Sequence, residues 1–206
     1  MRSNTVGAPC KRILDIAGAS IALAVAWPLM AAVAITIRLT MGGPILFRQV
    51  RPGRYEHPFT LFKFRTMGEA RSLAIDPSTD ATRLTRAGIA LRRFSLDELP
   101  QLWNVLKGEM SLVGPRPLLT EYLDYYTPEQ AKRHLMKPGI TGLAQVKGRN
   151  AITWEQKFLW DVWYVEHWSF WLDIRILLST VEKVIRREGI SQQGHATIEK
   201  FGVERK

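Results

Sequence analysis

The longest uncharged stretch of the chain places the strongest constraint on its fold. Residues 16–37 include no formally charged side chain over 22 consecutive positions, which is just enough helix to cross a bilayer. Pro28 lies near the middle, where a proline removes a backbone hydrogen bond and kinks a helix. We therefore expect two helical arms of about 15 to 18 Å, neither of which can cross a hydrocarbon core of about 30 Å alone.

The charges on both sides of this stretch favour a helical hairpin. It is preceded by Arg2, Lys11 and Arg12, with no acid among them, and followed by a run of cations that only Glu56 opposes: Arg38, Arg48, Arg51, Arg54, Lys63 and Arg65. Cytoplasmic flanks have such an excess. A re-entrant hairpin bent near Trp27-Pro28 places both flanks on one face. A straight transmembrane helix, a buried core helix and a cleaved signal peptide are the alternatives, although the apolar run continues well beyond the cleavage-like residues 24–26.

The composition limits the kind of partner and the compartment. The chain has 206 residues, enough for one domain with an appendage, and 29 Lys and Arg against 19 acids give a net charge of +10. This excess predicts a polyanionic partner, which can be nucleic acid, an anionic lipid surface or a phosphorylated substrate. A lone cysteine, Cys10, excludes an internal disulfide framework and fits a reducing cytosolic location.

The octapeptide SLDELPQL at 95–102 includes two adjacent carboxylates, and arginines flank it in the sequence. Asp97 and Glu98 follow Arg92, and Arg116 comes soon after in a Gly-Pro-Arg-Pro turn. A carboxylate can attack phosphorus or hold Mg²⁺ once cations offset the charge of the phosphoryl oxygens. The alternative is a capping box in which Ser95 begins a helix. A proline at position 100, just after that first turn, weakens this alternative.

The other segments predict short elements. Residues 45–47 and 59–64 have the pattern of strands around a turn at 51–53, with Lys63 as either a solvated lysine or a phosphate ligand. Residues 68–85 are expected to form a surface loop or a loop with a short helix. Residues 87–107 are expected to form a helix interrupted at the acidic pair, and residues 118–126 and 128–136 two more helices. Residues 140–150 are expected to be irregular and glycine-rich, with Arg149 as a possible anion donor.

The C-terminal part is expected to be helical and aromatic. Residues 153–167 begin with a capping box and include three tryptophans, with a fourth at position 168. This aromatic content favours a helix at a bilayer interface; a tryptophan-rich soluble core is the alternative. Ser169 is expected to cap a long amphipathic helix that ends at Gly189, with its apolar stripe in the core. The predicted fold is thus mostly α with a few short β-strands (α+β). Residues 1–41 are expected to form the hairpin segment, 42–188 a cytoplasmic domain that includes the acidic pair, and 189–206 a tail.

Several long motifs in a fixed order resemble the small monotopic phosphoglycosyl transferases of the bacterial sugar transferase family. They are KRILD at 11–15, KFRTM at 63–67, SLDELPQLWNV at 95–105, SLVGPRP at 111–117 and KPGITGLAQV at 137–146. The resemblance extends to Phe201 and is greatest with the minimal members that lack extra transmembrane helices, such as the enzyme that begins N-linked glycan assembly. Two departures are Trp27, where many relatives have Ser, and Lys147, where Asn is common.

The resemblance implies a function and a site. Such enzymes move a sugar 1-phosphate from a UDP-sugar to a polyprenyl phosphate such as undecaprenyl phosphate, with Mg²⁺ and release of UMP, at the cytoplasmic face of the bacterial inner membrane. The acidic pair of the family corresponds to Asp97, the nucleophile, and Glu98, a metal ligand or proton acceptor; both are candidate Mg²⁺ ligands. Its phosphate-binding cations correspond to Lys63, Arg92, Arg116 and Arg149, and its hairpin break to Pro28.

Two other classes of function compete with this interpretation. A membrane-tethered basic module that binds nucleic acid or anionic lipid fits the charge and the aromatic residues. The cations are, however, scattered along the chain, so we expect no nucleic-acid partner. A scaffold subunit of a larger synthase is the third possibility, and it predicts no activity from the purified chain.

Overall fold

The structure is a computed structural model that describes residues 7–68, 83–148, 151–186 and 201–202. Within these ranges the chain is mostly helical with a few short strands, which confirms the predicted composition of elements. The α-helices are α1 (Gly7–Met41), α3 (Arg86–Arg93), α4 (Gln101–Lys107), α5 (Pro128–Ala131), α6 (Leu143–Lys147), α7 (Trp154–Glu166) and α8 (Phe170–Arg186). The strands are β1 (Leu46–Pro52), β2 (Pro58–Phe64), β3 (Ser111–Val113) and β4 (Gly139–Thr141), and 3₁₀ turns occur at η1 (Arg54–Glu56), η3 (Leu96–Glu98), η4 (Thr120–Tyr125) and η5 (Lys132–Leu135).

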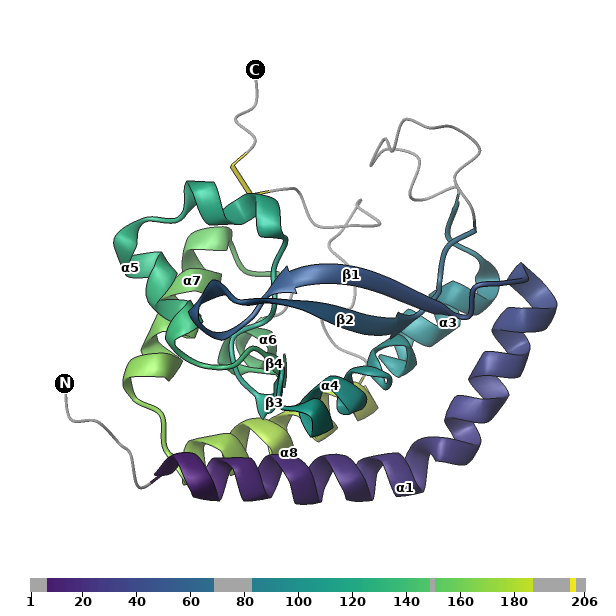
Figure 1. Ribbon diagram of the computed structural model, residues 1–206, viewed down its shortest axis with the longest axis horizontal. Helices are drawn as coiled ribbons and strands as arrows, with labels where there is room; N and C mark the ends of the chain where they lie inside the picture. The colour runs from purple at the N-terminus through teal and green to yellow at the C-terminus, as the bar shows by residue number, and fades with distance from the viewer. Residues whose placement is uncertain (1–6, 69–82, 149–150, 187–200, 203–206) are drawn as a thin grey trace.

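Helix α1 is long, apolar and bent. It runs without interruption from its first to its last residue with Pro28 inside. In Figure 1 one arm lies along the lower edge of the molecule and the other rises on the right towards α3. A proline inside a helix is a common cause of such a bend. The two arms therefore form one bent helix, and the re-entrant arrangement in a membrane stays a prediction.

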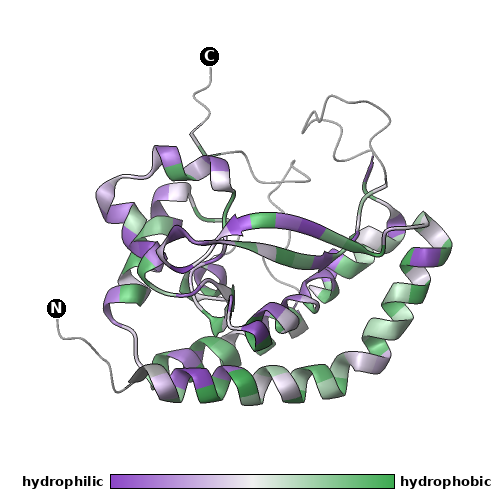
Figure 2. Cartoon of the chain, in the orientation of Figure 1, coloured by the Kyte–Doolittle hydropathy of each residue, from purple (hydrophilic) through white to green (hydrophobic). Residues whose placement is uncertain are grey.

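The apolar surface of α1 is mostly uncovered. Among the described residues it is the one helix long and apolar enough to cross a membrane, and little of this apolar segment is buried inside the protein. Val25 and Leu39 are 76% and 80% exposed, and hydrophobic residues occur along both arms (Figure 2). Exposed apolar surface of this extent marks a site of contact with a membrane or a partner. It does not fit the alternative of a buried core helix.

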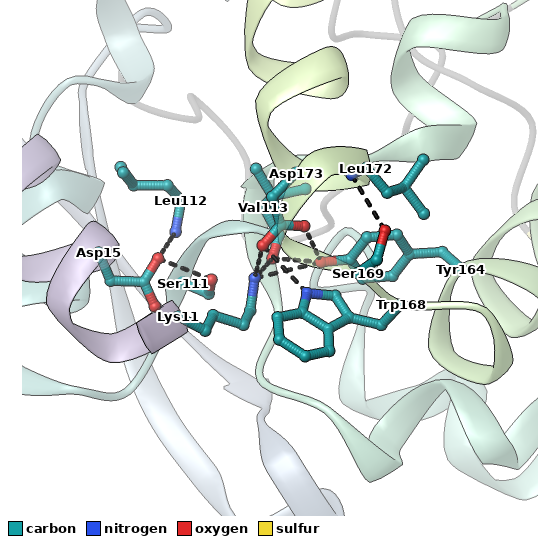
Figure 3. A network of polar contacts seen from close by, with 10 residues as sticks. All are labelled: Lys11, Asp15, Ser111, Leu112, Val113, Tyr164, Trp168, Ser169, Leu172 and Asp173. Carbon is teal, nitrogen blue, oxygen red and sulfur yellow. Dashed lines mark hydrogen bonds and ion pairs between the residues drawn. The ribbon is translucent and has the colours of Figure 1, made fainter. Parts of the chain in front are cut away.

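A buried polar network attaches the start of α1 to the rest of the protein (Figure 3). Lys11 Nζ lies 2.6 Å from Asp173 Oδ2 of α8 and donates to the backbone oxygen of Val113 at 2.9 Å. Asp173 also accepts hydrogen bonds from the Tyr164 hydroxyl at 2.6 Å and from Trp168 Nε1 at 3.0 Å. Both carboxylate oxygens of this fully buried acid are thereby satisfied, as a buried charge requires.

Three basic residues that flank the apolar stretch are engaged within the protein. Besides Lys11, Arg12 donates to the carbonyl oxygens of Val105 and Leu106 in α4 at 2.6 and 2.8 Å. Arg65 donates to carbonyl oxygens at and just after the end of α1. Carbonyl groups at helix C-termini lack partners within the helix, and such donors satisfy them. Fewer of the flanking basic residues are therefore available to face the membrane than the sequence suggested, which weakens the support that these charges give to a hairpin.

Strands β1 and β2 form an antiparallel hairpin above α1 (Figure 1). β1 is longer than predicted, and the turn lies after Pro52 rather than at residues 51–53. The reason is that the ladder continues to the pair Pro52 and Pro58, and the Gly53 amide then donates to the His57 carbonyl at 2.8 Å. Apolar residues of β2 pack in two clusters, one with the first arm of α1 and one with the second: Phe59 and Leu61 with Ala19, Leu102, Val105 and Met110, and Phe64 with Val33, Ile37 and Leu91.

Residues 140–150 were predicted to be irregular, but the described part of this segment, residues 140–148, contributes to β4 and forms α6. β4 pairs in parallel with β3, with Ser111 opposite Gly139. At this point two backbones approach so closely that a Cβ on Gly139 would lie 2.1 Å from the Gly114 nitrogen. Glycine is needed for that contact. The close pairing fixes the turn that follows β3 and includes Arg116.

The C-terminal helices follow the predicted caps but not the predicted burial. Thr153 begins α7 with a capping box, and the Ser169 hydroxyl accepts from the Leu172 amide at 3.2 Å at the start of α8. The apolar stripe of α8 was expected in the core, but Leu178 and Val181 are 67% and 58% exposed because no described segment covers that side. The two helices expected at 118–126 and 128–136 are shorter, with 3₁₀ geometry over η4 and η5. The predicted loop at 68–85 and the tail at 189–206 lie largely outside the described residues.

Candidate active site

The octapeptide 95–102 forms a tight bend rather than a helix start. Ser95 has a left-handed backbone, with φ of 55°, and its side chain makes no capping hydrogen bond. The capping-box alternative is therefore wrong. One 3₁₀ turn, η3, contains the acidic pair, and Pro100 then precedes the first residue of α4. The left-handed residue reverses the chain after α3 and sets Asp97 inward, where it is only 8% exposed.

Glu98 is bound by two of the predicted cations. Lys63 of β2 and Arg116 of the turn after β3 both donate to Glu98 Oε1 at 2.8 Å. Burial favours the protonated form of Glu98, but the charges of Arg116 and Lys63 and their hydrogen bonds outweigh burial and hold its pKa well below the usual range. Glu98 is therefore an anion at every physiological pH, and it fixes the two cations in place.

Asp97 is the contrasting member of the pair. Among the described residues none donates a hydrogen bond to its carboxylate. Burial and the adjacent charge of Glu98 raise its pKa, against the opposing charges of Lys63, Arg92 and Arg116. A buried carboxylate that is surrounded by cations but lacks hydrogen bonds keeps its lone pairs available. It can act as a nucleophile or take a metal ion.

Three of the four predicted cations converge on the acidic pair. Lys63 and Arg116 contact Glu98 directly. Arg92, near the end of α3, donates through Nε to the Thr66 hydroxyl at 3.0 Å, and its charge acts on Asp97. The cations come from a strand, a helix and a turn that are far apart in the sequence. The fourth, Arg149, lies outside the described residues.

One cation beside this cluster was not singled out by the sequence. Arg51 of β1 donates through Nη2 to Gln49 Oε1 at 2.6 Å, while its Nε is buried without a hydrogen-bond partner in the structure. Burial and the charge of Arg116 lower the pKa of Arg51 to about 10. In the sequence Arg51 was counted only as a flanking charge. The alternation of side chains along β1 could have indicated that Arg51 faces inward, but the sequence gives no sign that Arg51 lies near Arg116.

The acidic pair fits Mg²⁺ held jointly by protein and substrate. Among the described residues no group of three or more Asp, Glu, His or Cys side chains is placed to bind a metal. Mg²⁺ usually keeps several waters and takes one or two carboxylates together with phosphate oxygens, so it does not need such a cage. Within the described part of the chain no hydrogen bond reaches either Asp97 oxygen, and Glu98 uses Oε1 for both cations. The donor set therefore suits a metal ion that arrives with a phosphorylated substrate.

Comparison with known proteins identifies the relatives of this chain. The family model described as bacterial sugar transferase matches residues 6–187. A sugar transferase, EpsL, of Bacillus subtilis is 53% identical over 93% of this chain and 95% of its own length. A UDP-glucose:undecaprenyl-phosphate glucose-1-phosphate transferase of Caulobacter vibrioides is 43% identical over 85% of this chain and 69% of its own length. An undecaprenyl-phosphate galactose phosphotransferase of Salmonella typhimurium is 40% identical over 87% of this chain, which spans only 41% of that enzyme.

Proposed function

Since this chain belongs to the bacterial sugar transferase family, we propose that it transfers a sugar 1-phosphate from a UDP-sugar to undecaprenyl phosphate and releases UMP. Two relatives are named for this kind of transfer, one of glucose 1-phosphate and one of galactose phosphate. The observation that supports the proposal most is Asp97, a buried carboxylate that accepts no hydrogen bond from the described residues and lies beside Lys63, Arg92 and Arg116. A diphosphate needs such cations before a carboxylate can approach it.

The proposed reaction has two displacements at the phosphorus next to the sugar. In the first, an Asp97 oxygen bonds to this phosphorus while the bond between the phosphorus and the bridging oxygen breaks. UMP leaves with the bridging oxygen, and a phosphosugar ester of Asp97 forms. In the second, a phosphate oxygen of the lipid bonds to the same phosphorus and the bond to Asp97 breaks. The product is the lipid diphosphate sugar, and the free carboxylate returns.

The side chains around Asp97 would make the first displacement possible. Lys63, Arg92 and Arg116 would bind the phosphoryl oxygens and offset their charge, which otherwise repels the carboxylate. Arg149 stays a candidate for the same role. Glu98 holds Lys63 and Arg116 in place and would accept a proton or share a metal ion with Asp97. Mg²⁺ held by these two acids would supply further neutralisation of the diphosphate.

We also propose that α1 enters and leaves the bacterial inner membrane on the cytoplasmic side. The exposed apolar surface of α1, its bend and its internal proline at Pro28 support this arrangement. The exposed apolar side of α8 and Trp171, which is 71% exposed, fit an interfacial position beside the membrane. In this arrangement residues 1–41 form the membrane segment, 42–188 the catalytic domain and 189–206 the tail.

Labelling of single cysteines tests the membrane arrangement. Cys10 is exposed near the start of α1, and Thr40 is exposed near its end. We expect a membrane-impermeant maleimide to label Cys10, and also Thr40→Cys in a Cys10→Ser background, in inverted membrane vesicles but not in intact spheroplasts. Labelling of the two positions from opposite sides would indicate a single crossing instead.

Transfer by the purified protein tests the reaction. The protein is incubated with Mg²⁺, undecaprenyl phosphate and a panel of UDP-sugars, and UMP is measured. We expect UMP with at least one donor, including a stoichiometric burst before any lipid is added, because the first displacement does not need the acceptor. Labelled sugar phosphate should then be bound to the protein. A requirement for lipid before any UMP appears would favour a ternary complex with Asp97 as a base.

The same preparation separates the competing functions. The binding-module alternative predicts tight, salt-dependent affinity for nucleic acid and no UMP with any donor. The scaffold alternative predicts neither. Charges such as Arg12 and Arg65, which bind backbone carbonyl oxygens within the protein, reduce the free cationic surface that nucleic-acid binding needs.

A further inference from the structure

Arg133 is a fully buried arginine that connects three other parts of the chain. It lies in η5, and its side chain is 2% exposed. Nε and Nη2 donate to Asp161 Oδ2 of α7 at 3.2 and 2.7 Å, and Nη1 donates to the Tyr126 hydroxyl at 3.1 Å. Nη2 also donates to the backbone oxygen of Arg116 at 2.7 Å. The guanidinium thus connects α7 to the turn that carries a cation of the candidate active site.

The backbone around Arg116 is held by hydrogen bonds both before this residue and at its own carbonyl oxygen. Before it, the Gly114 amide donates to the Thr141 oxygen at 2.9 Å and the Gly139 amide donates to the Pro115 oxygen at 3.0 Å. At Arg116 itself the backbone oxygen accepts from Arg133. Prolines at 115 and 117 further restrict this turn. Since the backbone is held in this way, the Arg116 side chain reaches Glu98 from a defined position.

Packing alone does not account for an ion pair at this place. Burying two charges has a desolvation cost, and apolar side chains of similar volume often give equal or greater stability. Among the described residues Asp161 Oδ1 is buried without a hydrogen-bond partner, and the carboxylate accepts its side-chain hydrogen bonds from Arg133 alone. What apolar residues cannot supply is the hydrogen bond to the Arg116 oxygen. A planar guanidinium oriented by a carboxylate gives that bond a fixed direction.

We propose that Arg133 and Asp161 form a positioning pair that orients Arg116 towards Glu98 and the diphosphate of the donor. This inference rests on the proposed transfer function. Both side chains are almost fully buried, at 2% and 4% exposed; Asp161 orients Arg133, and Arg133 holds the backbone of Arg116. Arg133 therefore contributes to transfer only through the side chain at position 116.

A double-mutant cycle tests this dependence. The variants are Arg133→Met, Arg116→Ala and the double variant, and kcat/KM is measured with radiolabelled UDP-sugar. We expect Arg133→Met to lower kcat/KM about 10-fold or more in the wild-type background and less than about twofold when Arg116 is already Ala. The same cycle on the dissociation constant of UMP, measured by calorimetry, gives values even for inactive variants. Equal effects of Arg133→Met in both backgrounds would overturn the proposal.

Two further variants separate positioning from folding. Arg133→Met combined with Asp161→Leu removes both charges, so it should unfold at a temperature equal to or above that of the wild type while transfer stays low. Normal transfer by this variant would also overturn the proposal. Lys11→Met breaks the other buried pair and should give effects that add to those of Arg116→Ala. If no donor in the panel yields UMP with the wild type, the proposed function fails, whereas the UMP-binding cycle still decides the positioning role.

Discussion

Two buried aspartates in this protein have opposite surroundings. Asp173 is fully buried and accepts hydrogen bonds from Lys11, Tyr164 and Trp168, so both its oxygens are satisfied. Asp97 is nearly as buried and lies among more cations, yet none of the described residues donates a hydrogen bond to it. The first arrangement neutralises a buried charge and stabilises the fold. The second leaves a carboxylate available to bond to a substrate or a metal ion.

The comparison shows that the nearby charges do not by themselves identify a reactive acid. Both aspartates have a cation close by, and what distinguishes them is whether donors are aimed at the carboxylate oxygens. At Asp97 the cations are engaged elsewhere: Lys63 and Arg116 bind Glu98, and Arg92 binds Thr66. Glu98 therefore keeps these cations near Asp97 without allowing them to neutralise it.

Loss of the Asp97 carboxylate should have the largest effect on activity. We expect Asp97→Asn to lower transfer by roughly 10⁴-fold or more, as the removal of a nucleophile does in other enzymes, while UDP-sugar binding survives. Single-turnover release of UMP and calorimetric binding of the donor measure the two quantities. Asp124→Asn removes a charge from an exposed acid and serves as the matched control, with activity near that of the wild type. Near-normal turnover by Asp97→Asn would show that Asp97 is not the nucleophile.

Loss of the Asp173 carboxylate should instead affect folding. Asp173→Asn leaves Lys11 buried without an acid, and we expect a loss of about 3–5 kcal/mol in the free energy of unfolding. Thermal or denaturant unfolding in detergent measures this. Glu109→Gln, which breaks the partly exposed pair with Lys107, should cost no more than about 1 kcal/mol. If Asp173→Asn were as stable as the wild type, the satisfied network would not be what attaches α1.

The sequence predicted the acidic pair but not the network around Asp173. Asp97 and Glu98 are adjacent, and their cations occur in recognisable motifs, so local chemistry and resemblance were sufficient. Lys11 and Asp173 are 162 positions apart, and nothing in the residues near Lys11 distinguishes a buried partner of a distant acid from a membrane-flanking charge. Arg133 was missed for the same reason, because its partners lie on three other elements.

Local patterns also failed where the backbone takes an unusual conformation. Ser95 and Glu98 have the spacing of a capping box, but the left-handed backbone of Ser95 turns the side chain away from that role. The stretch at 140–150 looked irregular because of its glycines, but Gly142 is required where the chain after β4 approaches the turn after β3, since a Cβ there would lie 2.2 Å from the Gly114 backbone oxygen. In both cases long-range packing determines the backbone conformation, which intrinsic preferences do not predict.

Removal of one cation should have an intermediate effect, because Glu98 has two. We expect Lys63→Met to lower kcat/KM by about 10- to 100-fold, the usual cost of a hydrogen bond to a charged group, since Arg116 still holds Glu98. Lys107→Met removes the lysine at the end of α4 from its ion pair with Glu109, outside the site, and should change kcat/KM by less than about twofold. Equal effects of the two variants would mean that Lys63 is an ordinary structural lysine.

The smallest expected effect is that of Asp97 on stability, and its sign is opposite to that of Asp173. The raised pKa of Asp97 means that its carboxylate binds a proton more tightly in the folded protein than in the unfolded chain. Its stabilising contribution is therefore present below the unfolded pKa of about 3.9 and is lost as the pH rises through the folded pKa. At pH 7, without Mg²⁺, Asp97→Asn should melt above the wild type, and the difference should shrink as the pH falls towards 4. Asp173→Asn should melt below the wild type at pH 7, because its carboxylate is the acceptor that Lys11, Tyr164 and Trp168 need. A lower melting temperature for both variants at pH 7 would mean that Asp97, too, is part of the structural framework.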